Sequence, residues 1–287
     1  MPTVFITGTS SGIGRGTAKC FLEHGWNVAG TQLACDIEKE SELTRYPNFR
    51  LYELDVLDHE RIPQVAEQVV SDFGSIDVII NNAGIGIMGP IELGKREQIL
   101  KILQVNVLGY ILVTQAFLPY MRAARKGTIV NVGAMGARLV HPGLGYYNMT
   151  KAAVAALSEE LVMELAPLGI DVKLIEPSGV KSNLGSVGTA FLDPTAIADY
   201  KYFYDVQLPQ TGRVVDGTVV GTDEYYPPIE PEEMGAIIYN AVSSGDRTFR
   251  HQSGPHARRL LEERAKLTDQ EYIDHYKKFF KAEPENA

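Results

Sequence analysis

A tyrosine and a lysine four residues apart are the side chains best suited to moving a proton in this sequence. Tyr147 and Lys151 fall in a stretch that predicts a helix over Tyr146–Leu168, so they share one helix face. A free phenol has a pKa near about 10, too high for a base at neutral pH, and a neighbouring ammonium lowers it. The spacing alone is a weak signal for a general acid–base centre, and an ordinary amphipathic helix is the structural alternative.

A glycine-rich segment near the start of the chain has the spacing of a phosphate-binding turn. Gly8, Gly12 and Gly14 follow a predicted strand at Val4–Thr7 and open a predicted helix at Ile13–His24. The first glycine permits a tight turn, the second lets the backbone approach a pyrophosphate, and the third allows close helix–strand packing. The helix N-terminus offers free N–H groups and partial positive charge to the anion. A glycine-rich turn without a ligand is the alternative.

The rest of the first 180 residues or so alternates between strand and helix patterns. Predicted strands cover Val4–Thr7, Asn27–Gln32, Arg50–Val56, Asp77–Ile80, Gly127–Val132 and Asp171–Ile175, and predicted helices cover Ile13–His24, Leu57–Phe73, Lys95–Met121 and Tyr146–Leu168. Runs such as Val78–Ile80 are apolar at successive residues, which suits parallel strands buried on both faces. We therefore expect an α/β fold, a doubly wound (Rossmann) parallel sheet with helices on both faces, in a single domain of residues 1–287.

The regular alternation stops after Pro177. Residues 185–231 form a segment too long for a plain connection, so we expect a functional insertion, a substrate-binding lid. Within it, Tyr202, Phe203 and Tyr204 are candidates to line the substrate pocket, and packing at a subunit interface is the alternative. Arg213–Val220 predicts a β-hairpin, and helices are expected again at Pro231–Ser243, His256–Lys266 and Asp269–Lys281.

Six motifs, in order and in register over about residues 3–184, resemble those of the short-chain dehydrogenase/reductase family. They are the cofactor fingerprint at Thr7–Gly14, the adenine-contacting pair Asp55-Val56, the sheet-stabilising Asn81–Gly84, the catalytic-helix Asn106, the Tyr147-x-x-x-Lys151 pair, and the nicotinamide-contacting Pro177, Val180 and Ser182. The resemblance implies a set of cofactor-binding residues: Gly8, Ser10, Ser11, Gly12, Ile13, Gly14, Arg15, Gln32, Asp55, Val56, Asn82, Ala83, Gly84, Tyr147, Lys151, Pro177, Val180 and Ser182.

The same resemblance implies an oxidoreductase that interconverts a carbonyl and a secondary alcohol. A hydride would move between nicotinamide C4 and the substrate carbon while Tyr147 handles the proton. Lys151 would hold the nicotinamide ribose and, with the oxidised nicotinamide, favour the phenolate. Asn106 would anchor a water chain to Lys151.

The family pattern also places a serine 13 residues before the tyrosine, where it holds the substrate oxygen. In this sequence that position is Ala134, which carries no hydroxyl. Losing one oriented donor at a reacting oxygen typically costs about 10²–10³ in rate. Three explanations are open: an engineered Ser→Ala variant, a natural protein that uses another donor such as Tyr146 or Ser178, or a relative repurposed for non-redox chemistry or dinucleotide sensing.

The choice between NADP(H) and NAD(H) depends on the end of the second predicted strand. An acid about 20 residues past the glycines would bond the ribose 2′-hydroxyl and favour NAD(H). Gln32 stands there instead, and Asp36 comes late. We therefore expect no carboxylate to repel a 2′-phosphate, and Arg15 is a candidate to attract one unless it is simply a solvated helix residue. NADP(H) is favoured, with NAD(H) as the alternative.

Composition limits the classes of partner. The formal net charge of −9 at pH 7 opposes binding to nucleic acid or anionic membranes. Cys20, Cys35 and the scattered histidines form neither a disulfide framework nor a metal-spaced cluster, so no metal is expected. With no signal peptide and no apolar stretch of about 18 residues, we expect a cytoplasmic protein. A homodimer or homotetramer is expected through the helices Lys95–Met121 and Tyr146–Leu168, whose apolar residues exceed one core-facing stripe.

Overall fold

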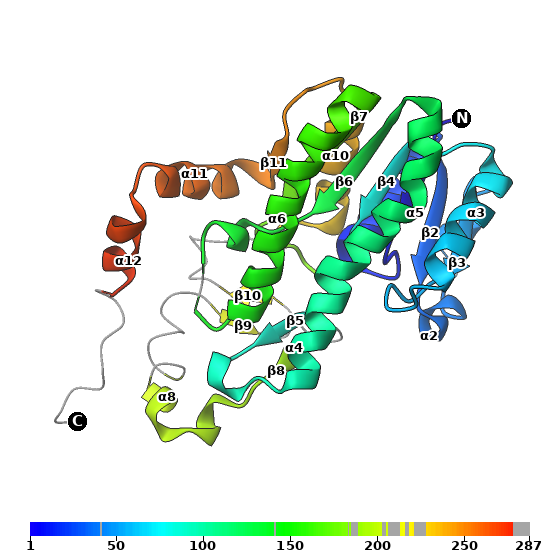
Figure 1. Cartoon of the computed structure of the whole chain (residues 1–287). Helices are drawn as coiled ribbons and strands as arrows, with labels where there is room; N and C mark the ends of the chain where they lie inside the picture. Colours follow the sequence, from blue (N-terminus) through cyan, green and yellow to red (C-terminus); the bar gives the residue numbers. More distant parts are fainter. Residues whose placement is uncertain are drawn as a thin grey trace.

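The computed structural model describes residues 1–40, 42–140, 142–182, 184, 189–202, 205, 213–215, 218–220 and 228–277 (Figure 1). Within these residues, seven strands form one sheet in the order β11-β7-β6-β4-β1-β2-β3, and every neighbouring pair is parallel. The strands are β1 (Thr3–Ile6), β2 (Asn27–Gln32), β3 (Phe49–Glu53), β4 (Val78–Asn81), β6 (Gly127–Val132), β7 (Ile170–Glu176) and β11 (Arg250–Gln252). The predicted doubly wound α/β fold is confirmed, and β11 is a strand that the sequence patterns did not reveal.

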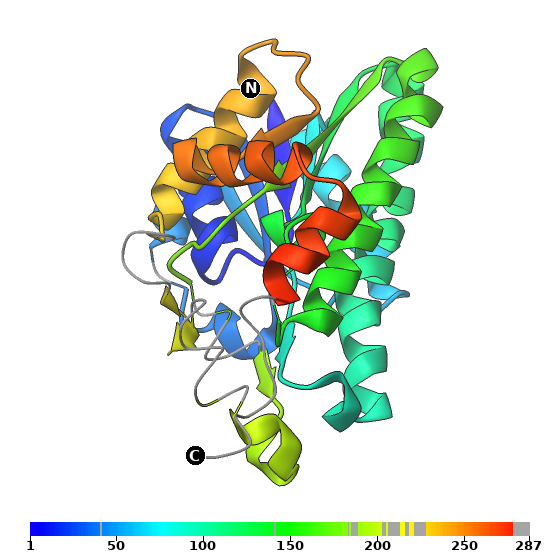
Figure 2. The same ribbon diagram turned by 90° about the vertical axis from the view of Figure 1, so that its left-hand side faces the viewer.

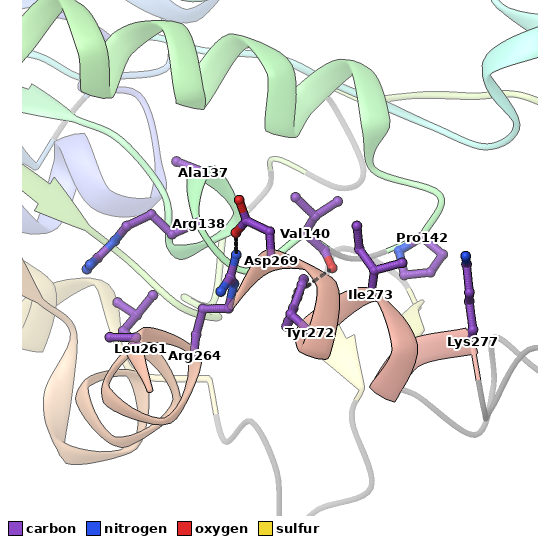
Figure 3. Close-up of a pocket in the computed structure, with 11 residues that line it drawn as sticks. Ala137, Arg138, Val140, Pro142, Leu261, Arg264, Asp269, Tyr272, Ile273 and Lys277 are labelled. Atoms are coloured by element: carbon purple, nitrogen blue, oxygen red, sulfur yellow. Dashed lines mark hydrogen bonds and ion pairs between the residues drawn. The ribbon is translucent and has the colours of Figure 1, made fainter. Parts of the chain in front are cut away.

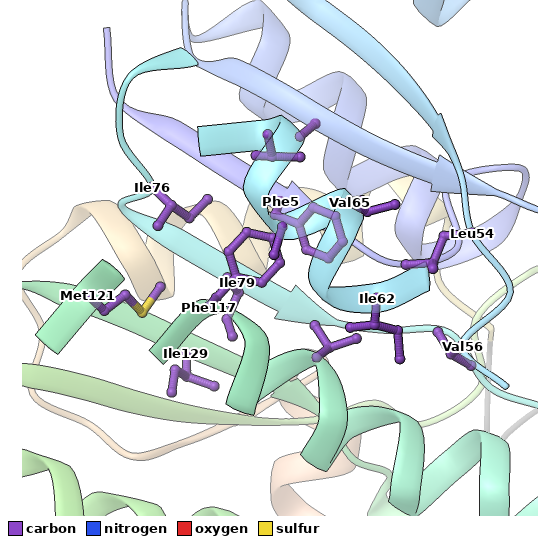
Figure 4. Close-up of a cluster of buried hydrophobic side chains, with 14 of the residues drawn as sticks. Phe5, Leu54, Val56, Ile62, Val65, Ile76, Ile79, Phe117, Met121 and Ile129 are labelled. Carbon is purple, nitrogen blue, oxygen red and sulfur yellow. The ribbon is translucent and has the colours of Figure 1, made fainter. Parts of the chain in front are cut away.

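Helices cover both faces of this sheet (Figures 1 and 2). On one face lie α3 (Arg61–Phe73), α5 (Gly109–Ala124) and α6 (Gly145–Leu165), and on the other lie α1 (Gly12–Glu23) and α10 (Pro231–Ser243). Each face therefore has its own apolar layer. In the first layer the Phe5 and Phe117 rings meet with centroids 4.5 Å apart, beside Ile79 and Ile129 (Figure 4). This packing fixes the strand ends from which the candidate site residues project.

The predicted helix Lys95–Met121 is interrupted at its centre. It consists of α4 (Arg96–Leu103), a π-helical turn at Gln104–Leu108, and α5. The helical stretch Arg96–Ala124 is, by length and composition, long and apolar enough to cross a membrane. The sequence expectation that no such apolar segment occurs is therefore wrong. Packing of α5 on the sheet accounts for the apolar residues of its buried side.

The predicted lid is anchored at its base. Val180 and Ile229 form a parallel β-bridge, so the chain leaves and returns at one point. Between them, β8 (Thr189–Phe191) pairs with β5 (Gly86–Met88), which directly follows the Asn-Asn-Ala-Gly motif. β9 (Arg213–Val215) and β10 (Thr218–Val220) form the predicted antiparallel hairpin. Most of the remaining lid lies outside the described residues.

The remaining α-helices follow β2, lie in the lid or end the described chain. α2 (Ala34–Ile37) follows β2, α8 (Ala198–Tyr202) lies in the lid, and α11 (Gly254–Ala265) and α12 (Asp269–Lys277) end the described chain. The predicted helices at His256–Lys266 and Asp269–Lys281 correspond to α11 and α12, the last four residues of the second prediction being outside the description.

Candidate functional site

The glycine turn has the backbone that its sequence requires. Gly8 and Gly12 have φ values of +73° and +53°, a region that side chains rarely adopt. A Cβ on Gly14 would lie 2.0 Å from the Gly8 carbonyl oxygen, so only glycine fits there. Ser11 precedes the first residue of α1, and Ser10, Ser11 and Ile13 are half-buried around the turn. The N-terminus of α1 therefore presents its free N–H groups beside a close-packed turn.

The Asn-Asn-Ala-Gly segment locks this turn in place. Asn82 Nδ2 donates hydrogen bonds to the carbonyl oxygens of Thr7 at 2.8 Å and Gly8 at 3.0 Å. In return, Thr7 Oγ1 accepts hydrogen bonds from the backbone N–H groups of Asn82 at 2.9 Å and Ala83 at 3.0 Å. The ends of β1 and β4 are thus joined directly under the glycine turn.

Asn106 lies in the π-helical turn between α4 and α5 and is fully buried. Its Oδ1 accepts a hydrogen bond from the Ile85 N–H at 2.8 Å, and its Nδ2 donates to the Ile85 carbonyl at 2.9 Å and to Thr150 Oγ1 at 3.0 Å. Gly84 passes close by, since a Cβ there would lie 3.3 Å from Asn106 Oδ1. π-Helical turns are frequent at functional sites. This one ties the segment after Gly84 to the helix that carries Tyr147 and Lys151.

Lys151 is held by groups on two other elements. Its Nζ donates to the Val132 carbonyl at 2.7 Å and to the hydroxyl of Tyr110 at 3.3 Å, and that hydroxyl donates to the same carbonyl at 3.1 Å. Nζ also lies 5.7 Å from the ring centroid of Tyr147 and 5.3 Å from that of Tyr110. Sequence reasoning found Tyr147 and Lys151 but missed Tyr110, because nothing along the chain signals a contact made across 41 residues.

Burial dominates the protonation of this pair. Removal from water raises the pKa of Tyr147 to about 12 and lowers the pKa of Lys151 to about 7. In the protein alone burial raises the pKa of Tyr147, and its lowering by Lys151 together with an oxidised nicotinamide stays a prediction. At neutral pH Tyr147 is therefore a protonated phenol, a proton donor rather than a base.

Ala134 lies at the start of the turn Met135–Ala137, where the Met135 N–H donates to the Pro177 carbonyl at 2.9 Å. The two hydroxyls named as substitutes for the serine are both engaged. Tyr146 donates to the Ile91 carbonyl at 2.6 Å, and Ser178 Oγ is 2.8 Å from Ser253 Oγ. These contacts do not support either group as the replacement donor.

At the end of β2 a carboxylate meets the predicted specificity residues. Glu40 Oε2 accepts hydrogen bonds from Gln32 Nε2 at 2.9 Å and from Arg15 at 2.7 Å. The expectation that no carboxylate lies beside Gln32 is therefore wrong. Burial would raise the pKa of Glu40, but hydrogen bonds from Arg15, the Leu43 N–H and Gln32 outweigh it and hold that pKa at about 2. Arg15 is therefore not simply a solvated residue, because it pairs with Glu40 and Glu42, and its role toward a 2′-phosphate stays a prediction.

The other predicted cofactor residues lie around the same strand ends. Asp55 is exposed and its Oδ1 accepts a hydrogen bond from the Leu57 N–H at 2.9 Å, while Val56 is buried beneath Gly109. Pro177 is buried, and Ser182 lies against the glycine turn, since a Cβ on Gly12 would be 2.8 Å from Ser182 Cβ. Phe203, Tyr204 and the side chain of Tyr202 lie outside the described residues.

A groove of about 840 Å³ opens between the segment after Ala134 and the C-terminal helices (Figure 3). Ala137, Arg138, Val140 and Pro142 line one side, and residues of α11 and α12 such as Tyr272 line the other. None of the predicted site residues lines it.

The residues around the glycine turn fit a nicotinamide dinucleotide. The turn lets the backbone approach a pyrophosphate, and a buried acceptor of Gln32, Oε1, has no hydrogen-bond partner in the described chain. Tyr147 and Lys151 lie on a helix that Asn106 connects to the segment next to the turn. When bound, such a group supplies or accepts a hydride.

Comparisons with known proteins agree with this arrangement. The family described as short chain dehydrogenase matches residues 2–189. A 3-ketodihydrosphingosine reductase from Bacteroides thetaiotaomicron is 32% identical over 255 residues, 88% of this chain and 87% of the relative. A crystal structure of a short-chain dehydrogenase from Streptomyces avermitilis superposes with a TM-score of 0.76 at 30% identity, covering 96% of this chain and 98% of that one.

A third similar protein was solved with a nucleotide. The 3-ketoacyl-(acyl-carrier-protein) reductase from Brucella melitensis, complexed with NADH, superposes with a TM-score of 0.70 at 25% identity, covering 88% of this chain and 96% of that chain. The doubly wound fold, the geometry of the site and the sequence similarity to these proteins together define a Rossmann-type oxidoreductase. The chain belongs to the short-chain dehydrogenase/reductase family.

Proposed function

We propose that this protein is an NAD(P)(H)-dependent oxidoreductase that interconverts a carbonyl and a secondary alcohol. The observation that carries the proposal is that buried Lys151 lies beside the ring of half-buried Tyr147, on a helix that Asn106 connects to the segment next to the glycine turn. Its relatives include reductases of keto groups, which supports the same reaction type. NADP(H), which the sequence favours, and NAD(H) are the candidate cofactors, and the contacts of Glu40 bear on the choice between them.

The protein's own groups handle the proton. In the reducing direction, a bound nicotinamide would supply the hydride for the carbonyl carbon, and the Tyr147 hydroxyl would give its proton to the carbonyl oxygen. The high pKa of about 12 keeps Tyr147 protonated before this step. Lys151 lies beside the tyrosine ring and stabilises the phenolate that results, and its own hydrogen bonds to Val132 and Tyr110 hold it there.

Ala134 leaves the substrate oxygen without the serine hydroxyl that the family pattern places there. Tyr146 and Ser178 are engaged elsewhere, so this sequence carries out the reaction slowly, whether Ala134 is natural or engineered. The same observation favours a second candidate function, a relative that keeps the dinucleotide for non-redox chemistry or for sensing.

Restoring the hydroxyl separates the two functions. The variant Ala134→Ser and the unchanged protein are compared for oxidation of NADH and NADPH with a panel of ketones, aldehydes and β-ketoacyl compounds. The oxidoreductase proposal expects turnover to rise by about 10²–10³. Tight dinucleotide binding with no gain for any carbonyl supports the non-redox relative instead.

We also propose a domain organisation, an assembly state and a cellular location for this protein. We propose one domain of residues 1–287, with residues 185–231 as the lid over a small-molecule substrate. Its anchored base at Val180 and Ile229, and the pairing of β8 with β5, support the lid. A homodimer or homotetramer in the cytoplasm is the proposed state, and exposed apolar side chains on the helices, such as Leu108 and Met163, support the assembly.

A further inference from the structure

Ser253 lies between β11 and the first residue of α11, and it is 2% exposed. A serine at this position usually accepts a hydrogen bond from one of the first N–H groups of its own helix. The Ser253 side chain makes no such bond. Its Oγ instead accepts a hydrogen bond from the backbone N–H of Ser178 at 2.6 Å and lies 2.8 Å from Ser178 Oγ. The hydroxyl therefore holds a segment 75 residues earlier in the chain.

The bond from Ser178 continues the pairing of two strands past the point where their backbones separate. The register of β11 against β7 ends with Gln252 opposite Glu176, and the Ser253 N–H donates to the Glu176 carbonyl at 3.4 Å. Two residues further on, the Ser178 N–H donates to the Ser253 side chain. The hydroxyl thus supplies the acceptor that a neighbouring strand would otherwise provide for this N–H group.

The segment Pro177–Ser182 connects the two ends of the candidate site. Its first carbonyl accepts a hydrogen bond from the Met135 N–H at 2.9 Å, beside the position where the family pattern has its serine. Its last residue lies against the glycine turn, since a Cβ on Gly12 would be 2.8 Å from its own Cβ. In doubly wound sheets, ligands bind beyond the carboxyl ends of the strands. A dinucleotide that reaches from the glycine turn to Tyr147 would therefore run along this segment.

Two further contacts of the segment depend on the returning end of the lid. The Ile229 N–H donates to the Gly179 carbonyl, and the Lys181 N–H donates to the Ile229 carbonyl, both at 3.0 Å. Ser253, in contrast, follows a strand of the seven-stranded sheet, so its bond ties the segment to the rigid part of the fold. A binding surface that is already fixed loses less conformational freedom when a ligand binds.

We propose that Ser253 is a positioning residue for the nicotinamide ring of the cofactor, acting through the backbone N–H of Ser178. It keeps Pro177–Ser182 in the position that the ring requires, and it touches neither cofactor nor substrate. This role rests on the proposed function. Ser253 lies outside residues 2–189, the part of the chain that the family description matches, so the family motifs do not point to it.

Binding of the whole cofactor and of a fragment that lacks the ring tests this role without any need for turnover. Dissociation constants of NADH and NADPH are measured by fluorescence titration, and those of ADP-ribose and 2′-phospho-ADP-ribose by competition, for the unchanged protein and Ser253→Ala. Ser253→Ala should weaken the tighter-binding dinucleotide by about tenfold, which corresponds to one net hydrogen bond. It should weaken the matching ring-free fragment by less than about twofold.

Two other serine variants complete this comparison. Ser243→Ala is the matched control, because it removes an exposed hydroxyl whose bond to the Tyr239 carbonyl lies within α10. It should leave all four dissociation constants within about twofold. Ser178→Ala retains the N–H group that donates to Ser253, so it should weaken the dinucleotide by less than about threefold. A loss in Ser178→Ala as large as that in Ser253→Ala contradicts the route through the backbone N–H.

The remaining outcomes separate the positioning role from the proposed function. An equal loss for the dinucleotide and its fragment, or no loss for either, overturns the positioning role and leaves the proposed function standing. If neither NADH nor NADPH binds the unchanged protein, the proposed function fails and the positioning role fails with it.

Hydrogen exchange of the unchanged protein covers the case in which Ser253→Ala does not fold. If the ring requires the held position of the segment, ligand binding suppresses the opening that exposes the Ser178 amide. At equal saturation, the dinucleotide should slow exchange of that amide at least about threefold more than the ring-free fragment does. Equal protection by the two ligands overturns the positioning role.

Discussion

The ammonium of Lys151 and the hydroxyl of Tyr110 are 3.3 Å apart, and both donate to the backbone carbonyl of Val132. Among the described residues no carboxylate contacts Lys151, so its charge depends on these neutral groups and on two tyrosine rings. Tyr110 is therefore a positioning residue for Lys151, supplied by α5 to a pair carried by α6.

Replacing Tyr110 tests this positioning role. Tyr110→Phe removes an acceptor of the lysine N–H, so the charged form loses stabilisation and the pKa of Lys151 falls below its value of about 7. In an Ala134→Ser background, the limb of the kcat/KM profile that reports Lys151 should move to lower pH by about one unit. Tyr120→Phe, on an exposed tyrosine of the same helix, serves as the control. An unshifted profile with only a loss of stability would reduce Tyr110 to a packing residue.

Lys151 should lower the stability of the folded protein at neutral pH. Its pKa is about 7 in the folded protein against an ordinary value of 10.5, so the unfolded chain binds more protons between these pH values. The penalty is full below pH 7, shrinks as pH rises through this window, and vanishes above it. Lys151→Met should therefore stabilise the protein by on the order of 2–4 kcal/mol at pH 7 and by much less near about pH 10. Thermal melts at both pH values decide this, and a gain that does not depend on pH contradicts it.

Glu176, the last residue of β7, joins the segment after Ala134 to the edge strand β11. It is 1% exposed and pairs with Arg138 at 2.7 Å and Arg250 at 2.7 Å. Glu176→Gln should destabilise the protein by about 3–5 kcal/mol, because two partly buried guanidinium groups lose their shared carboxylate. Glu159→Gln removes a 53% exposed partner of Arg250 and should cost less than about 1 kcal/mol. Urea unfolding measures both, and equal losses would show that burial of Glu176 is unimportant.

Patterns along the chain predicted the elements that their own residues mark. The strand Gly127–Val132 and the helix Pro231–Ser243 match the structure at both ends, because apolar runs and a helix-starting proline mark them locally. β11 was missed because its three residues, Arg-His-Gln, are polar and take strand form only through pairing with β7. Its place in the sheet is a tertiary effect that no local pattern encodes.

The same distinction separates the site residues that the sequence predicted from those that it did not. Gly14 and Asn82 were found because their motifs are contiguous, and the structure brings them together. Glu40 and Tyr110 were not, since they reach the site from loops and helices 8 and 41 residues away from their partners. The absence of the serine follows from its expected distance of 13 residues before the tyrosine. The hydrogen bond from Tyr146 to the Ile91 carbonyl, in contrast, is seen only in the structure.

The central claim, that Tyr147 donates the proton in a nicotinamide-dependent carbonyl reduction, is tested most directly by one comparison in the Ala134→Ser background. Carbonyl-dependent oxidation of the preferred dinucleotide is followed for Tyr147→Phe and for Tyr146→Phe, whose neighbouring hydroxyl is bound to the Ile91 carbonyl. The account predicts that Tyr147→Phe lowers kcat by about 10²–10⁴ with dinucleotide affinity retained, whereas Tyr146→Phe stays within about tenfold. Unchanged turnover in Tyr147→Phe would contradict it.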